Sequence, residues 1–185
     1  EMLDPTTSKV FAVADHQIAH VYIRDASLIP QVKALLLAMP GVEYVWDKTE
    51  QAAHHIAHER SGELVVMSDA RSWFTYYFWL DDALAPDFAR TVEIHRKAGY
   101  DPVELFLDPK LAFPKLYIVW KLVKKLLGFR MLLDVIPLDA NLVKGSHGRP
   151  TDDPLDGPLV MSDVPSLLPD TVSATDIKAI ALKHL

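Results

Sequence analysis

The hydrophobic pattern of the first 70 residues predicts a small α+β unit. Four short runs rich in apolar and β-branched residues read as strands: Lys9–Ala14, Ile18–Ile23, Val42–Trp46 and Glu63–Ser68. Leu28–Met39 instead repeats apolar residues at helical spacing, with Ser27 as the expected N-cap and Pro40-Gly41 as the stop. We therefore expect a cap-like strand–helix–strand unit over residues 9–70, with the helix covering one face of the sheet.

The middle of the chain, residues 71–140, reads as a loop-rich insertion. Its aromatic run Trp73–Trp79 favours a strand. Leu80–Pro109 is dense in Asp and Pro and predicts a long ordered loop. An amphipathic helix is expected over 111–127, ended by Gly128, and a short strand within Met131–Leu138.

The last part, residues 141–185, predicts C-terminal elements of a larger α/β sheet. We expect a loop over Lys144–Gly157, a buried strand at Pro158–Ser162 and a closing helix over 174–185 capped by Ser173. A lone strand exposes unpaired backbone groups. This edge, or the aromatic run at 73–79, predicts a homo-oligomer contact.

Composition narrows the classes of partner. The net charge is −6 without a long basic block, which argues against nucleic acid as the main partner. The chain has no cysteine, which excludes disulfides and thiolate metal sites. Leu111–Phe129 contains Pro114 and four lysines, so we expect no membrane span and no membrane partner. The polar start without a signal peptide favours the cytoplasm.

Gly145-Ser-His147-Gly-Arg149 is the first candidate for chemistry. An imidazole between glycines is free of steric cover and suits zinc or a similar ion. The guanidinium of Arg149 matches phosphate oxygens. The alternative is an ordinary turn with a solvent-exposed histidine.

Asp15-His16 ends an apolar run and offers a carboxylate and an imidazole that can share a metal. An ordinary hairpin turn explains the pair equally well, because Asp is common in turns.

Two further segments carry imidazoles. Glu93–Pro102 gathers His95, Arg96, acids and a glycine turn, and such a loop can bind phosphate. The alternative is a solvated surface loop. His54-His55-x-x-His58 has spacing that can place imidazoles on one helix face, but it lacks the H-E-x-x-H pattern, and we interpret it as a surface helix.

The order of these pieces resembles the C-terminal portion of the type I phosphodiesterase/nucleotide pyrophosphatase branch of the alkaline-phosphatase superfamily. The resemblance runs through the strand pair 10–23, His58-Glu-Arg-Ser-Gly62-Glu followed by its apolar strand, Gly145-Ser-His147-Gly148, Pro158–Ser162 and the closing helix from Ala174-Thr-Asp176-Ile177. It implies metal-dependent hydrolysis of phosphate esters or phosphodiesters with a small-molecule substrate. It also implies a divalent cofactor, zinc with manganese as the alternative, and His147 as a late ligand.

Departures from that pattern shape the expectation. Nothing matches the family's early Thr or Ser nucleophile, so the chain is expected to be a C-terminal fragment that is inactive alone. Gln17 follows Asp15-His16 where the family motif has Gly, so the pair can be a look-alike of the family ligands. Metal ligation is assigned to His147, with Asp15 and His16 as weaker candidates, and substrate binding to Arg149, His95 and Arg96. The alternative is a non-catalytic binding or assembly domain.

Overall fold

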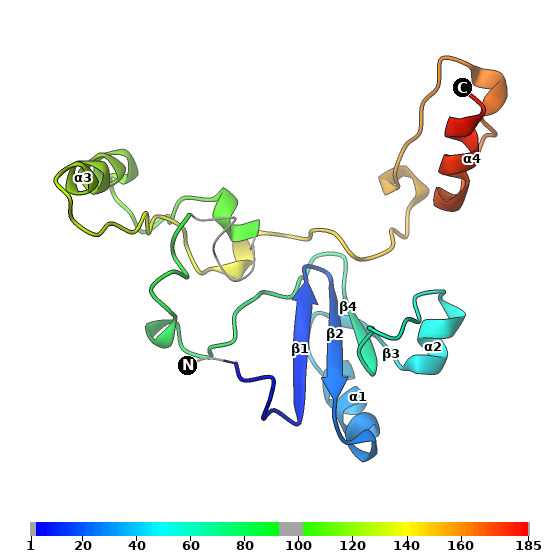
Figure 1. Cartoon of the computed structure of the whole chain (residues 1–185), viewed down its shortest axis with the longest axis horizontal. Coiled ribbons are helices and arrows are strands. Elements are labelled where there is room, and N and C mark those ends of the chain that lie inside the picture. The colour runs from blue at the N-terminus through cyan, green and yellow to red at the C-terminus, as the bar shows by residue number, and fades with distance from the viewer. Residues whose placement is uncertain (1–2, 93–101, 185) are drawn as a thin grey trace. The chain divides into compact units, whose positions relative to one another are not determined.

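A computed structural model describes residues 3–92 and 102–184. The chain divides into two compact units, Glu1–Arg149 and Pro150–Leu185. The first unit holds a four-stranded antiparallel sheet of order β1-β2-β4-β3 (Figure 1). Its strands are β1 (Val10–Asp15), β2 (Ile18–Ile23), β3 (Val42–Trp46) and β4 (Leu64–Ser68). These four strands confirm the predicted ones to within a residue, and with the helices they give the expected α+β fold.

One face of the sheet forms the main core. The register pairs Ala14 with Ala19 and Ala19 with Val66, so these small and branched side chains share a face. Helix α1 (Ile29–Leu37) covers this face with side chains that include Val32 and Leu36. The periodicity of its apolar residues therefore predicted the correct face.

The start of this helix differs from the prediction. Asp25, rather than Ser27, is the capping residue, and its carboxylate accepts the backbone N–H of Ser27. It caps a short 3₁₀ turn, Ala26–Leu28, which leads into α1. The hydroxyl of Ser27 donates to the carboxylate of Asp25, and α1 itself has no side-chain cap.

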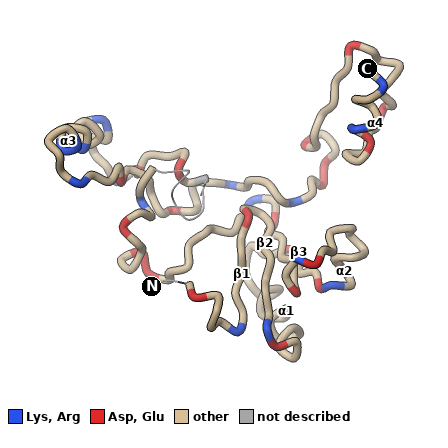
Figure 2. The backbone as a smooth tube through the Cα atoms, viewed as in Figure 1, with Lys and Arg blue, Asp and Glu red and all other residues tan. Residues whose placement is uncertain are grey.

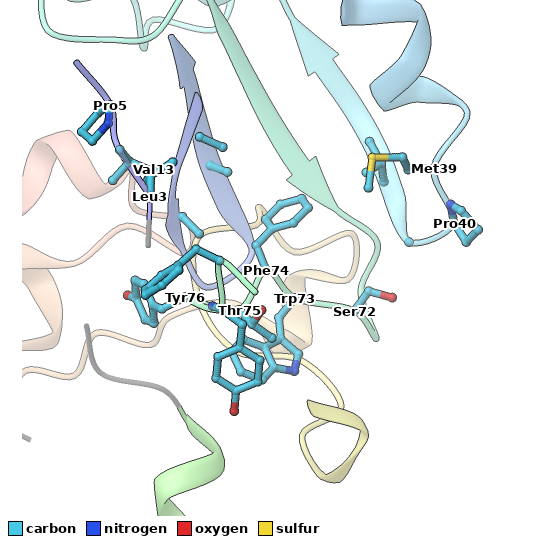
Figure 3. Close-up of a pocket in the computed structure, with 17 residues that line it drawn as sticks. Leu3, Pro5, Val13, Met39, Pro40, Ser72, Trp73, Phe74, Thr75 and Tyr76 are labelled. Carbon is cyan, nitrogen blue, oxygen red and sulfur yellow. Dashed lines mark hydrogen bonds between the residues drawn. The ribbon is translucent and has the colours of Figure 1, made fainter. Parts of the chain in front are cut away.

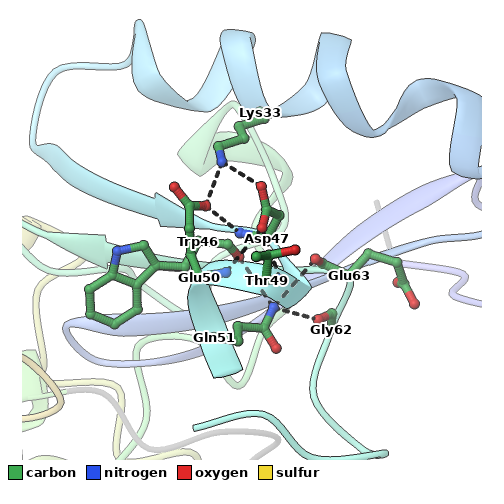
Figure 4. Close-up of polar contacts among 8 residues, drawn as sticks. All are labelled: Lys33, Trp46, Asp47, Thr49, Glu50, Gln51, Gly62 and Glu63. Carbon is green, nitrogen blue, oxygen red and sulfur yellow. Dashed lines mark hydrogen bonds and ion pairs between the residues drawn. The ribbon is translucent and has the colours of Figure 1, made fainter. Parts of the chain in front are cut away.

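Helix α2 (Lys48–Ala53) is fixed at its first turn by a capping box between Asp47 and Glu50. Lys33 of α1 donates to both carboxylates (Figure 4). The buried amide of Gln51 donates to the carbonyl oxygens of Trp46, Gly62 and Glu63, which ties α2 to the ends of β3 and β4.

The predicted histidine helix is wrong. Helix α2 ends at Ala53, and His55 has a φ of 58°, which no helix continues through. His54 stacks on Trp46 with ring centroids 3.9 Å apart, and His58 accepts the N–H of Arg60. The three imidazoles therefore do not share one helix face.

The aromatic run 73–79 does not form a strand either. Its β-type pairing is limited to one isolated bridge between His16 and Phe74. Its rings pack locally instead: Trp79 stacks on Tyr77 and meets Phe78 edge-on. Sequence propensity predicted extended backbone here, but no partner strand lies beside it among the described residues.

The described part of the 80–109 loop contains neither a strand nor an α-helix, which agrees with a loop there. Two 3₁₀ turns, Asp82–Leu84 and Pro102–Leu105, interrupt it. A second small core is formed by the buried side chains of Trp79, Ala89 and Leu138. The short strand expected within Met131–Leu138 is absent there, although the backbone of Ile136 donates to the carbonyl oxygen of Arg90.

Helix α3 (Pro114–Leu126) ends as predicted. Gly128 has a φ of 82°, and the N–H groups of Gly128 and Phe129 donate to the carbonyls of Lys125 and Lys124. This pair of hydrogen bonds is a Schellman motif. Its left-handed residue is usually glycine, because glycine has no Cβ. No helix in the described ranges 3–92 and 102–184 is long and apolar enough to cross a bilayer.

In the second unit, the buried strand expected at Pro158–Ser162 is wrong. These residues form no strand, and Leu159 and Met161 are 81% and 83% exposed. The described part of the unit offers no neighbouring strand to pair with them. Helix α4 (Ile177–Leu182) follows a 3₁₀ turn that Ser173 caps, so the predicted helix start is close but its length is overestimated.

Candidate metal centre

The hairpin between β1 and β2 carries the first half of the site. Asp15 pairs with Ile18, which leaves His16-Gln17 as a two-residue loop. His16 adopts a φ of 60°, a left-handed conformation that histidine tolerates better than most residues. The backbone N–H of Phe74 donates to the carbonyl oxygen of His16, at 2.6 Å. This hydrogen bond ties the turn to the 72–78 segment.

The loop 145–148 carries the second half and lies directly on this hairpin. Glycine is required at both ends of it. A Cβ on Gly145 would lie 2.8 Å from the carbonyl oxygen of Ala70, and a Cβ on Gly148 would lie 2.8 Å from Ile18 Cγ2. Both glycines also have φ values, 128° and 105°, that other residues resist. The sequence suggested that these glycines leave His147 uncovered. The structure adds a second role, because the absence of a Cβ lets the loop approach the hairpin closely.

Gln17 joins the two halves. Its backbone N–H donates to the carbonyl oxygen of His147, at 2.8 Å, and its side-chain oxygen accepts the N–H of Ser146, at 2.9 Å. The side-chain nitrogen donates to the carbonyl oxygens of Asp69 and Ser72. Only 4% of Gln17 is exposed.

Sequence reasoning treated Gln17 only as a departure from the family motif and missed this role. A buried amide with several backbone partners leaves no local signature in the sequence, since those partners come from distant segments.

Asp15, His16 and His147 meet as a result. Each offers one ligand atom, and these atoms all lie within 4.8 Å of one another. The rings of His16 and His147 stack with centroids 4.1 Å apart, and His147 Nε2 lies 3.9 Å from a carboxylate oxygen of Asp15. Asp15 and His147 are exposed, whereas His16 is buried. The structure thus brings together the three residues that the sequence named separately as metal ligands.

The surroundings of His16 favour its neutral form. Burial lowers the pKa of the imidazole, the neighbouring His147 lowers it further, and Asp15 acts in the opposite direction. Nδ1 of His16 lies 2.5 Å from the hydroxyl of Ser146. When Nδ1–H donates to that hydroxyl, Nε2 keeps its lone pair, which is the arrangement usual for a metal-binding histidine.

The predicted substrate-binding residues are placed less favourably. The guanidinium of Arg149 pairs with Glu43 at 2.7 Å, and its side chain is only 8% exposed. Arg149 therefore anchors the loop to β3 in this structure. His95 and Arg96 lie outside the described residues.

A cavity of about 760 Å³ has aromatic side chains in its lining, among them Trp73, Phe74 and Tyr76 (Figure 3). It is lined by β1, by residues 39–42 and by residues 72–78. The rings of Trp73 and Tyr76, which line it, have centroids 6.2 and 6.0 Å from that of His16. His16 is therefore the residue of the cluster that lies beside the aromatic rings of the cavity.

Comparison with known proteins gives a family but no close relative. The family described as type I phosphodiesterase / nucleotide pyrophosphatase matches residues 1–101, which is more than half of the chain and includes Asp15 and His16. The matched span ends before the 145–148 loop. No curated protein and no solved structure matches the chain. Because the family match covers more than half of the chain, including all four strands of the sheet and the hairpin of the cluster, the chain belongs to the type I phosphodiesterase / nucleotide pyrophosphatase family.

Proposed function

We propose that the chain supplies part of a divalent-metal site for phosphoester hydrolysis, with Asp15, His16 and His147 as the ligands. The observation that carries this proposal is the convergence of two imidazoles and one carboxylate from segments 130 residues apart. Family membership supports the coarser conclusion of a phosphodiesterase-like hydrolase.

The donor set fits zinc. Catalytic zinc sites commonly use three protein ligands drawn from His and Asp or Glu, with an open position for substrate or water. Two atoms bonded to one tetrahedral zinc lie about 3.3 Å apart. The 3.9 Å between His147 Nε2 and Asp15 is close to this value, and His147 is exposed enough to adjust. Manganese prefers more oxygen ligands, so zinc is the better match.

Each ligand residue has a distinct task in this proposal. Asp15 contributes negative charge that offsets the cation, and the buried His16 contributes a neutral imidazole on a fixed backbone. His147 closes the site from the facing loop. A divalent ion held there would stabilise negative charge on the oxygens of a phosphate ester. The aromatic cavity beside His16 offers room for the organic group of such an ester.

Three expectations remain part of the proposal. The nucleophile is expected to lie outside this chain, so the chain alone is expected to be inactive. Arg149 would bind phosphate only if its pair with Glu43 opened. A homo-oligomer through an exposed sheet edge would use β1 or β3, the outer strands.

Zinc binding tests the proposal directly. Equilibrium dialysis of the chain against a zinc buffer should show a site that His147→Ala or Asp15→Asn weakens by more than about tenfold, because each variant removes a ligand. His58→Ala is the matched control, since His58 is exposed and far from the cluster in sequence. Inorganic phosphate should bind more tightly to the zinc-loaded chain than to the metal-free one. Unchanged zinc affinity in His147→Ala would refute the assignment.

A further inference from the structure

Helix α3 carries an exposed apolar face that is unusually large for a short helix. None of its residues is buried. Six apolar side chains that fall on one arc of the helix are between 37% and 86% exposed: Leu116, Val119, Trp120, Val123, Leu126 and Leu127. An exposed apolar patch of this kind marks an interaction surface rather than ordinary surface variation.

The opposite side of the helix contacts Asp134 in the segment that follows it. The hydroxyl of Tyr117 donates to the carboxylate of Asp134, at 3.1 Å, and the ammonium of Lys121 pairs with the same carboxylate at 2.6 Å. Lys121 also lies 5.0 Å over the ring of Tyr117. The helix is therefore attached to the following segment through its polar side, and its apolar side faces away from that attachment.

Charge separates this surface from the other exposed apolar residues of the chain. No acidic residue occurs between Asp108 and Asp134, whereas the same stretch contains six cations: Lys110, Lys115, Lys121, Lys124, Lys125 and Arg130. The whole chain has a net charge of −6. Figure 2 shows the helix with basic positions and no acidic ones.

Two other exposed apolar segments carry less basic charge: Leu155 has Asp153 and Asp156 beside it, and Leu35 and Leu37 lie between Asp25 and Glu43 in a stretch with one cation, Lys33. The dense basic charge around α3 is therefore not shared by these two segments.

We propose that α3 lies on the surface of an anionic phospholipid bilayer. An interfacial helix combines an apolar face with Lys or Arg at its margins, and its lysines keep their charge at the headgroups while their stems follow the apolar surface. Lys115 and Lys124 occupy the two margins of the apolar arc, and Trp120 lies within it. At 13 residues the helix is about 20 Å long, too short to span a bilayer of roughly 30 Å. This contact revises the expectation of no membrane partner.

Vesicle sedimentation tests this inference with the full chain. Vesicles of phosphatidylcholine with phosphatidylserine should bind the chain at low salt at least about tenfold more tightly than vesicles of phosphatidylcholine alone. Binding should fall as salt rises, because the lysine contribution is screened. Lys124→Glu/Lys125→Glu and Leu126→Ser should each weaken it by about tenfold or more.

Matched controls separate membrane contact from general effects. Lys178→Glu/Lys183→Glu makes the same charge change on exposed residues of and beside α4, and Leu155→Ser removes a side chain as exposed as Leu126. Neither should change vesicle binding. Absence of binding to the anionic vesicles, or equal losses in the controls, would overturn the proposal. So would self-association that Leu126→Ser abolishes without any vesicle binding, since the face would then be covered by a second copy.

Discussion

Gln17 donates its backbone N–H to the carbonyl oxygen of His147, and the two atoms are 2.8 Å apart. This bond joins a hairpin turn of the sheet to a loop 130 residues later. It brings the ring of His147 into a stacked contact with the ring of His16, with the centroids 4.1 Å apart. Gln17 therefore acts as the connection between the two halves of the cluster.

Replacing Gln17 with Met should impair zinc binding as well as stability. The variant keeps the side-chain length but leaves the N–H of Ser146 without its acceptor, and the carbonyls of Asp69 and Ser72 keep only the hydroxyl of Ser68 as a donor between them. We expect a loss of about 1–3 kcal/mol in unfolding free energy, the cost of buried polar groups left unsatisfied. Zinc affinity should also fall, measured by dialysis at a temperature where the variant remains folded.

Gln51→Met is the control for this prediction. Gln51 is fully buried and likewise donates to backbone carbonyls, but it lies in α2, away from the ligand cluster. Its loss should lower stability by a similar amount and leave zinc affinity unchanged. If both variants affect zinc equally, Gln17 has no specific positioning role.

Gly148→Ala should separate the loop from the hairpin. The added methyl group would lie 2.8 Å from Ile18 Cγ2 on a residue whose φ is +105°. Zinc affinity should fall by more than about tenfold, since His147 would move away from Asp15. Gly128→Ala is the comparison, because its φ is +82° but nothing lies within 4 Å of the added carbon. That variant should cost about 1 kcal/mol in stability and leave zinc binding intact.

The sheet and α1 were predictable because their signals are local. Apolar periodicity and β-branched runs set the strands at 10–23 and 64–68, and proline and glycine ended the helix before Val42. The runs at 73–79 and 158–162 carry the same local signal but lack a neighbouring strand in the described structure. Propensity reports that a segment can extend, not that another backbone lies beside it.

The candidate site was predictable only as separate parts. Asp15, His16 and His147 were each identified by residue type, and the glycines around His147 were recognised. Their meeting depends on the amide of Gln17 and on two close glycine contacts, which arise only after the chain has folded. The pairing of Arg149 with Glu43 was hidden for the same reason.

Substituting each partner of the Arg149–Glu43 pair in turn tests whether Arg149 anchors the loop or binds phosphate. If Arg149 is available to substrate, Glu43→Gln should raise the affinity of the zinc-loaded chain for inorganic phosphate, and Arg149→Met should lower it. We expect instead that both variants lower stability, by about 1–3 kcal/mol for Arg149→Met, because the pair is largely buried. Phosphate titration beside chemical denaturation measures the two effects; a gain in affinity for Glu43→Gln would assign Arg149 to substrate binding.

The stability contributed by Lys33 should depend on pH. Its ammonium donates to Asp47, and this bond is the largest cause of the lowered pKa of that carboxyl. A depressed folded pKa means that the contribution is complete above the unfolded aspartate value, about 3.9, and is lost as the pH falls through the lower folded value. At pH 7, Lys33→Met should reduce the unfolding free energy by only about 0.5–1 kcal/mol, because the carboxylates are partly exposed.

Urea unfolding at neutral and acidic pH measures this dependence. The difference between Lys33→Met and the unmodified chain should shrink toward zero as the pH falls through the lowered pKa of Asp47. Lys9→Met serves as the control, since Lys9 lies before β1 and its backbone carbonyl, rather than its ammonium, makes the bond to Arg24. A difference that stays constant across the acid range would mean that Lys33 acts through the packing of its methylene groups, because packing does not titrate with Asp47.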